Sequence, residues 1–192
     1  GPFRECMIID EAGVPIEVPG TPGEMCVRGL GLFDGYYNQP DTNAASFLPG
    51  GWFRTGDLVS RDERGWYYFL GRIKDVVRRA GENISAAEVE AAIETIEAVA
   101  KAVVVPVPDD VRGEEVKAYL VLKAGLLPDD LPPESIVEQL RGRISDYKIP
   151  RYFEYRTTLP RTDSDKLSKR ALLHERADLR ENSFDRVDST WH

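Results

Sequence analysis

The chain contains 192 residues, of which 42% are hydrophobic and 30% are charged, and its formal net charge at pH 7 is −8. This balance is typical of a globular protein with a real core, and so acidic a chain is a poor candidate for general nucleic-acid binding, which needs a basic face. It has no apolar run of about 20 residues, the length that spans a bilayer, and no charged-then-apolar signal segment. We therefore expect a cytoplasmic protein with no nucleic-acid partner and no membrane span.

Cysteine and histidine are scarce, and their spacing does not suggest a metal site. Cys6 and Cys26 lie in apolar, strand-like stretches, where free cysteines are commonly buried. The histidines are His174 and His192, and no Cys/His spacing matches a zinc site. We expect two reduced thiols and no metal bound by this chain.

Residues 1–72 have the pattern of a β-rich region. Short apolar runs alternate with turns rich in glycine and proline, which is typical of successive strands. The expected strands are 4–10, 24–28, 52–53, 58–60 and 66–70. A short helix is expected over 41–47, with Asp41 or Thr42 as its N-cap, and residues 62–65 are expected to form a hairpin turn.

The pattern changes after Arg72 and predicts a compact α+β domain over 73–176. Ser85 and Glu88 have the spacing of a capping box, and apolar residues of the following helix share one face. The further expected elements are strands 99–107 and 116–123, a helix from 132 to about 144, strand 152–156, and a helix from 167 to about 176. This order predicts a small, mainly antiparallel sheet with helices. Residues 177–192 are interpreted as a solvated tail.

Three polar stretches are not explained by packing. Residues 51–58 end in a Gly-Asp pair, which forms a turn or places Asp57 to accept hydrogen bonds from a vicinal diol such as ribose. Residues 71–85 combine basic residues, glycines and a helix start, which suits either an anion site or a solvated face between domains. Residues 159–170 form a cationic loop around Lys166. An exposed lysine is usually idle, but one delivered into a closed site stabilises developing negative charge.

In their order and spacing, these stretches resemble the adenylate-forming superfamily, which includes acyl- and aryl-CoA synthetases, peptide-synthetase adenylation domains and firefly-type luciferases. The resemblance covers about residues 5–170. The matching blocks are Gly23-Glu24, 35–40, Thr55-Gly56-Asp57, Gly71-Arg72, Lys74-Asp75, 81–85, 88–90, 109–114, 147–150, and 159–162 with Lys166. Each block is weak evidence alone, and their shared order makes them strong evidence together.

The resemblance implies roles for the residues that precede the capped helix. Asp57 would hold the ribose hydroxyls of ATP and of the acyl-adenylate, and Arg72 would support the same ribose. Lys74 would be the hinge about which the C-terminal domain rotates. Gly81, in the loop that continues with Glu82-Asn83, would allow close approach of the CoA pantetheine arm.

Lys166 would be the catalytic lysine that bridges the substrate carboxylate and the α-phosphate during adenylation. The family usually has glycine before this lysine, whereas this chain has Asp165. A carboxylate at this position can pair with Lys166 or Lys169 and restrain the loop. From their charge, Arg78 and Arg79 are expected to meet the phosphates of CoA.

The implied chemistry has two steps. A small carboxylic acid attacks MgATP to give acyl-AMP and pyrophosphate, and the C-terminal domain then turns so that CoA forms a thioester and releases AMP. Residues 1–72 would end the large adenylation domain as part of a β-barrel subdomain, and 73–176 would be the mobile domain. The phosphate loop, the Mg²⁺ site and the acyl pocket lie upstream of the matching region in the family. We therefore expect that this chain alone does not form acyl-AMP.

We favour an AMP-forming acid–thiol ligase of fatty acid metabolism, because no carrier domain follows the Lys166 helix. Two alternatives stay open: the adenylation domain of a peptide-synthetase-like enzyme, and a non-catalytic interaction module that keeps the fold. The acid itself is not readable, and medium-chain, branched, aryl and carnitine-like acids are all open. Residues 1–72 are also expected to expose apolar surface, through which the chain could associate with a second copy as a homo-oligomer.

Overall fold

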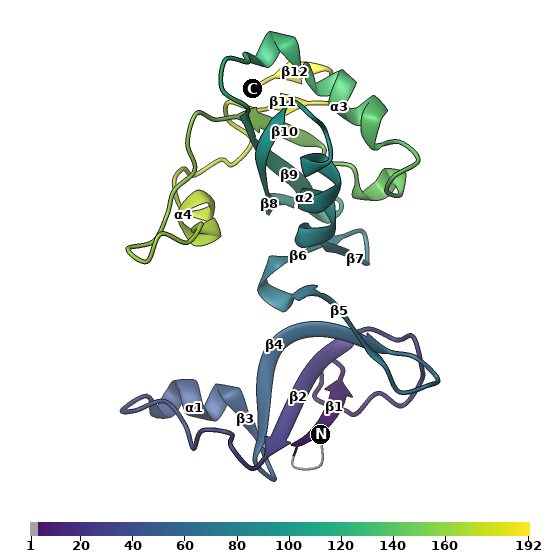
Figure 1. Ribbon diagram of the computed structural model, residues 1–192, viewed down its shortest axis with the longest axis vertical. Helices are drawn as coiled ribbons and strands as arrows, with labels where there is room; N and C mark the ends of the chain where they lie inside the picture. The colour runs from purple at the N-terminus through teal and green to yellow at the C-terminus, as the bar shows by residue number, and fades with distance from the viewer. Residues whose placement is uncertain (1–3) are drawn as a thin grey trace. The chain divides into compact units, whose positions relative to one another are not determined.

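The computed structural model describes residues 4–192. The chain divides into two compact units, Gly1–Lys74 and Asp75–His192, both drawn in Figure 1. None of the helices among residues 4–192 is long and apolar enough to cross a membrane.

The first unit is a curled antiparallel sheet. Its strands are β1 (Arg4–Ile9), β2 (Gly23–Gly29), β3 (Phe47–Leu48), β4 (Trp52–Arg61) and β5 (Tyr67–Arg72), and helix α1 (Pro40–Ser46) precedes β3. The order is β1-β2-β4-β3, with β5 paired to β4. Gly56 has a φ of +70°, and the register against β2 shifts beside it. β4 therefore bends, and Figure 1 shows it as the curved strand of this sheet.

The expected strands of the first unit are confirmed, but one pair of strands is continuous and the N-cap of the helix differs from expectation. The segments 52–53 and 58–60 belong to one continuous strand, β4. Neither Asp41 nor Thr42 is the N-cap of α1: the cap is Gln39, it makes no side-chain capping bond, and Pro40 occupies the first turn. Proline suits this place because its fixed φ is helical and its missing N–H would have no partner there.

The second unit is a mixed sheet covered on both faces, which confirms the expected α+β class. Its strands are β6 (Val76–Arg79), β7 (Glu82–Ser85), β8 (Val99–Asp109), β9 (Gly113–Leu122), β10 (Tyr152–Tyr155), β11 (Phe184–Asp185) and β12 (Thr190–Trp191). The order is β12-β11-β10-β9-β6-β7, with β8 paired to β9. The β9–β10 pair is parallel, and the other pairs are antiparallel.

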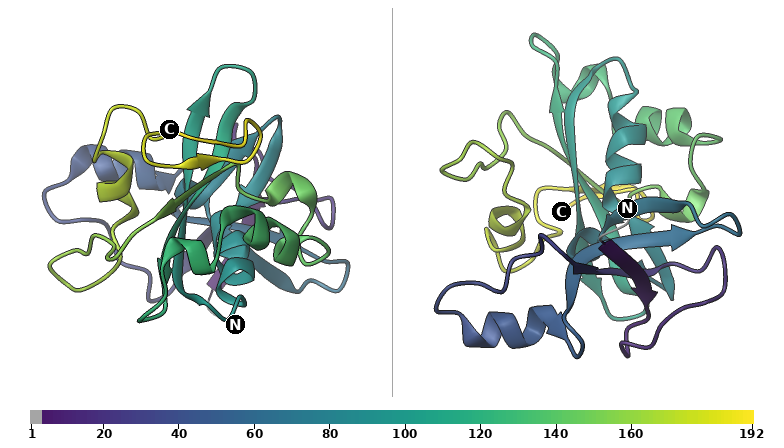
Figure 2. Two further views of the ribbon diagram at one scale, coloured as in Figure 1. Left: turned by 90° about the horizontal axis from the view of Figure 1, so that it is seen from above. Right: turned by 60° about the horizontal axis from the view of Figure 1, so that its bottom comes forward.

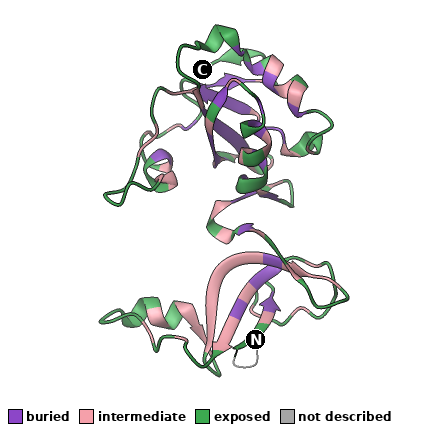
Figure 3. Ribbon diagram, viewed as in Figure 1, coloured by how far each residue is buried: buried purple, intermediate pink, exposed green. Residues whose placement is uncertain are grey.

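Three helices pack on this sheet: α2 (Ala86–Glu94), α3 (Pro133–Leu140) and α4 (Lys169–Leu173). Short 3-10 turns cover 73–75, 128–130 and 146–148. On β8, Ala102 and Val104 join the core beneath α2 and α3, whereas Val103 and Val105 pack with Leu172 of α4. Strands buried on both faces have nearly continuous apolar sequences, and Figure 3 shows buried residues concentrated here.

The boundaries of two helices in the second unit, and the capping of a third, differ from expectation. Ser85 caps α2 as expected, accepting from the Glu88 amide at 3.3 Å, but the Glu88 carboxylate is bound by Lys148 at 2.7 Å instead of completing the box. Helix α3 ends at Leu140 rather than near 144, because Gly142 has a φ of +79°. Helix α4 is confined to Lys169–Leu173.

The interpretation of residues 177–192 as a solvated tail was wrong. β11 pairs with β10 and β12, and Phe184 joins the main core. Asp185 is buried and is bound by Arg151 through two guanidinium nitrogens. Figure 2 shows this segment, in yellow, lying against the sheet. Its charged residues indicated solvent in the sequence, but the fold neutralises Asp185 with an arginine 34 positions away.

Candidate functional site

Asp57 and Arg72 meet across the edge of the first sheet. They are cross-strand partners on β4 and β5, and Arg72 Nη1 lies 2.9 Å from Asp57 Oδ1. The two groups are close enough for an ion pair, but their geometry is not that of a hydrogen bond. Among residues 4–192, no group donates a hydrogen bond to Asp57 Oδ1. The structure thus brings together the two residues that the sequence assigned to a ribose, and it buries Asp57 Oδ1 itself.

Glu24 stabilises the bend of β4 next to Asp57. Its side chain is buried, and Arg54 donates to its Oε2 at 2.8 and 2.5 Å. The Gly56 amide donates to Glu24 Oε1 at 3.1 Å, and Thr55 Oγ1 accepts from the Asp57 amide at 3.1 Å. Sequence reasoning included Glu24 in a matching block but gave it no role. The available signal was a carboxylate in an otherwise apolar strand, which needs a buried partner.

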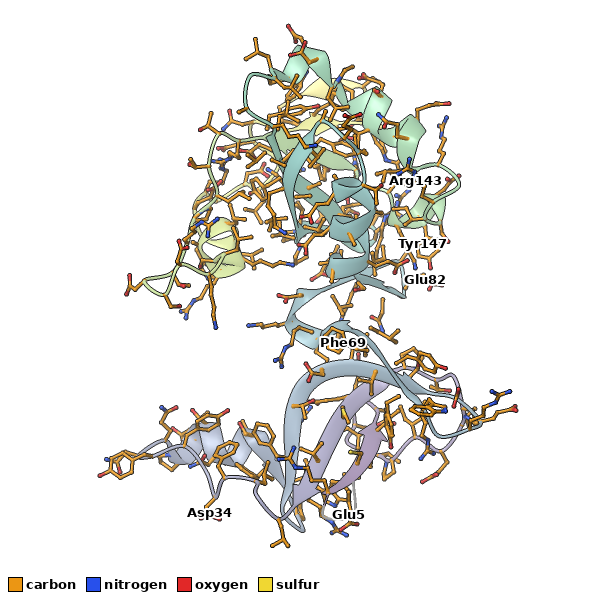
Figure 4. The ribbon with its side chains drawn as sticks, in the orientation of Figure 1. Glu5, Asp34, Phe69, Glu82, Arg143 and Tyr147 are labelled. Carbon is orange, nitrogen blue, oxygen red and sulfur yellow. The ribbon has the colours of Figure 1, made fainter. Side chains whose placement is uncertain are left out.

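The expected CoA loop is the turn of the β6–β7 hairpin, which sequence patterns did not predict. Ala80 and Gly81 have φ values of +50° and +85°, as a two-residue type I′ turn requires. A Cβ at Gly81 would meet no heavy atom within 4 Å, so glycine is favoured there by its backbone angle rather than by packing. Glu82 and Asn83 are exposed beside the turn, and Figure 4 labels Glu82.

The two arginines before this turn have different surroundings. Arg79 Nε donates to Glu115 at 2.6 Å, and Arg112 shares the same buried carboxylate at 2.7 Å. The Arg78 amide donates to Glu114 at 2.6 Å, and its side chain is exposed. The structure therefore gives Arg79 a structural ion pair and presents Arg78 at the surface.

Lys74 and Lys166 are exposed lysines at two different kinds of position. Lys74 lies in the 3-10 turn Ile73–Asp75, where the two compact units divide. Lys166 lies at the end of a loop that closes on itself: the Thr162 amide donates to the Lys166 carbonyl at 2.7 Å. The Lys166 amide in turn donates to Thr162 Oγ1 at 3.2 Å. Among residues 4–192 the Lys166 ammonium has no hydrogen-bond or ion-pair partner.

Comparison with known proteins shows that the chain is similar to AMP-binding enzymes. Residues 88–166 match the AMP-binding enzyme C-terminal domain. Over 174 residues, 91% of this chain and 30% of the relative, the chain is 39% identical to a long-chain-fatty-acid–CoA ligase of Bacillus subtilis strain 168. Over 169 residues, 88% of this chain and 31% of the relative, it is 44% identical to triostin synthetase I of Streptomyces triostinicus.

Among solved structures, the chain resembles o-succinylbenzoate CoA synthetase from Bacillus subtilis in complex with its acyl-adenylate intermediate. The TM-score is 0.78 at 35% identity, and the match covers 92% of this chain and 35% of that chain. The chain belongs to the adenylate-forming superfamily. It corresponds to the C-terminal portion of these enzymes and spans about 30% of the length of the curated relatives it matches.

The residue before Lys166 has a backbone conformation that glycine adopts more readily than aspartate does. Asp165 has a φ of +60°, a left-handed conformation that favours glycine and that aspartate tolerates better than most residues. Its carboxylate lies 3.3 Å from Arg161 Nη1. The expected pairing with Lys166 or Lys169 was wrong: Lys169 is bound by Glu90 at 2.7 Å, and no ion pair joins Asp165 to Lys166 within residues 4–192.

No group of three or more His, Cys, Asp or Glu side chains arranged to hold a metal ion occurs among residues 4–192. The described residues therefore do not offer a set of ligands for a Mg²⁺ ion. Both cysteines are free, with Cys26 buried and Cys6 exposed, and burial raises the pKa of Cys26 to about 11.

Proposed function

We propose that this chain is the C-terminal part of an ATP-dependent acid–thiol ligase that forms an acyl-adenylate and then a CoA thioester. The observation that carries the proposal is the unpaired Lys166 ammonium at the end of a self-closed loop, at the position of the superfamily's lysine. The Asp57–Arg72 pair and the β6–β7 hairpin support it. The similarity to a long-chain-fatty-acid–CoA ligase favours an acid of fatty acid metabolism.

In the first proposed step, a carboxylate oxygen of the acid attacks the α-phosphorus of ATP. A new P–O bond forms as the bond to pyrophosphate breaks, and negative charge builds on the oxygens around phosphorus. The Lys166 ammonium would stabilise this charge, which is the usual electrostatic source of rate enhancement. The ribose hydroxyls would donate to Asp57, and Arg72 would keep this carboxylate oriented.

In the second proposed step, residues 73–176 rotate about Lys74 as a mobile domain against residues 1–72, which end the large adenylation domain. The rotation would remove Lys166 and bring the Gly81 turn to the acyl-adenylate. The CoA thiolate then attacks the acyl carbonyl and releases AMP. The exposed Arg78 would bind a CoA phosphate, whereas Arg79 would hold the hairpin through Glu115.

The identity of the acceptor is the least constrained part of the proposal. The 44% identity to triostin synthetase I favours a carrier-bound thiol as a second candidate in place of free CoA. A cytoplasmic location is also a proposal, and one group of relatives is named as mitochondrial medium-chain acyl-CoA ligases. Both points are open to direct assay.

The test uses the complete protein that carries this chain. Acid-dependent pyrophosphate exchange should fall about 100- to 1000-fold in Lys166→Ala, the usual cost of removing one preorganised charge-stabilising group. The matched control is Lys123→Ala, which removes an exposed lysine outside the site and should leave exchange unchanged. CoA and a phosphopantetheinyl carrier are then compared as acceptors, and the 192-residue chain alone should show no exchange. Unchanged exchange in Lys166→Ala would favour a non-catalytic module.

A further inference from the structure

A cluster of charged residues closes the base of the segment that carries Lys166. We call it the base cluster, and its members are Lys117, Glu154, Arg156, Glu175 and Arg176. Arg156 begins the 156–176 segment, and Glu175 and Arg176 end it. Arg156 donates to Glu175, and Arg176 Nη2 lies 2.6 Å from the same carboxylate. The two ends of the segment are thus joined directly to each other.

Glu154 of β10 anchors this junction to the sheet. Its Oε1 lies 2.5 Å from Arg156 Nε, and its Oε2 accepts from Lys117 Nζ at 2.5 Å and from Arg176 Nη1 at 3.1 Å. The Glu154 side chain is 4% exposed and that of Lys117 is 0% exposed. Charges removed from water attract one another more strongly than surface pairs do, so these contacts hold the junction more firmly than exposed salt bridges would.

The rest of the segment has fewer restraints toward its tip. Leu159, Leu167 and Leu172 pack against Val103 and Tyr119 of the sheet. Beyond them, the tip at 162–166 is held by bonds within itself and by Arg161, which donates to the Asp165 carbonyl at 2.9 Å. Figure 1 shows this loop projecting beside α4. Lys169 also binds Glu90 of α2 at 2.7 Å. The direction in which the tip extends therefore depends on this ion pair, on the leucine packing and on the base together.

We propose that the base cluster is a positioning device for Lys166. By joining Arg156 to Glu175 and Arg176 over the buried Glu154, it fixes both ends of the segment and so helps to fix where the Lys166 ammonium is presented. Without this junction, a segment of this length has many more conformations, because loop-closure entropy grows with length. The inference rests on the proposed catalytic role of Lys166. The members of the base cluster act through Lys166 and do not themselves contact the substrate.

The charge balance of the base cluster provides a variant that should still fold. With three cations and two carboxylates, loss of one cation leaves equal numbers of positive and negative charges, so no buried charge is left unmatched. Arg156→Gln detaches the start of the segment in this way, and Arg156→Lys keeps the charge as a conservative rescue. Arg112→Gln is the matched control, because Arg112 shares the buried Glu115 with Arg79 as Arg156 shares Glu154 with Arg176.

The experiment measures the two half-reactions of the complete enzyme separately. In Arg156→Gln, kcat for adenylation should fall about 10- to 100-fold, the range expected for a small misplacement of a catalytic group. Its KM for ATP and the rate of thioester formation from supplied acyl-adenylate should change by less than about twofold. Arg156→Lys should recover part of the loss, and Arg112→Gln should adenylate normally.

Amide hydrogen exchange on the 192-residue chain supplies a readout without catalysis. Arg156→Gln should speed exchange across 157–175 and leave β8 and β9 protected. The inference is overturned if Lys166→Ala is inactive while Arg156→Gln adenylates normally, or if Arg156→Gln loses both half-reactions equally. Normal adenylation in Lys166→Ala would instead overturn the proposed function, which separates the two failures.

Discussion

The two compact units differ in how much apolar surface each one buries. Among residues 4–74, the buried hydrophobic side chains are Ile8, Ile9, Cys26 and Val59, whereas residues 75–192 contain all three buried core clusters. Apolar burial is the dominant favourable term in folding. The second unit therefore has the larger buried core, and we expect the first unit to be the less stable of the two when each stands alone.

The aromatic residues of the first unit make the same point. Phe33, Phe47 and Phe53 contact one another at ring-centroid distances of 5.1 to 5.6 Å, but this cluster is half-exposed. Trp66 and Phe69 are 69% and 64% exposed, and Figure 4 labels Phe69 on β5. Large aromatic side chains contribute most when they are buried, so here they add little to the stability of the unit.

Separating the two units should give the largest effect. Residues 75–192 expressed alone should melt cooperatively, because their core is complete, whereas residues 1–74 alone should not reach a unique fold. Thermal melts followed by circular dichroism, together with the dispersion of amide NMR signals, measure this directly. A cooperative transition in residues 1–74 would contradict the comparison. Loss of the transition in residues 75–192 would show that their core needs the first unit.

Within the second unit, the base cluster predicts a strongly asymmetric pair of variants. Glu154→Gln leaves three cations facing one carboxylate, and breaking a buried ion pair in this way should cost about 3–5 kcal/mol. Lys117→Met balances the remaining charges and should cost only about 1 kcal/mol for the lost hydrogen bond to the Leu179 carbonyl. Burial lowers the pKa of Lys117 because it disfavours the charged ammonium, and this also reduces the stability lost when the lysine is replaced. Urea unfolding of the 192-residue chain measures both, and equal costs would refute the charge argument.

The smallest expected effect concerns a buried hydroxyl. The Tyr119 hydroxyl has no hydrogen-bond partner among residues 4–192, and burial raises the pKa of Tyr119 to about 12. Tyr119→Phe should therefore stabilise the second unit by up to about 1 kcal/mol at neutral pH. Tyr155→Phe is the matched control, and it should destabilise by a similar amount because the Tyr155 hydroxyl donates to the Leu131 carbonyl. Chemical denaturation of the two variants should show opposite shifts.

Local sequence patterns were sufficient for most of the regular structure. The apolar runs at 99–107 and 116–123 predicted β8 and β9, and Ser85 marked the start of α2. The ordered motif blocks also indicated the superfamily. These features depend on residues a few positions apart. Their backbone preferences and the spacing of their apolar side chains can be read directly from the sequence.

The tertiary structure decided which charges are buried and what they bind. Glu154 with Lys117, Asp185 with Arg151 and Glu24 with Arg54 are partners 37, 34 and 30 positions apart. A charged residue in a sequence indicates solvent, and only folding shows whether a distant opposite charge replaces that water. For this reason the C-terminal segment and the support of the Lys166 loop could not be predicted from the sequence, and the catalytic role of Lys166 stays a prediction.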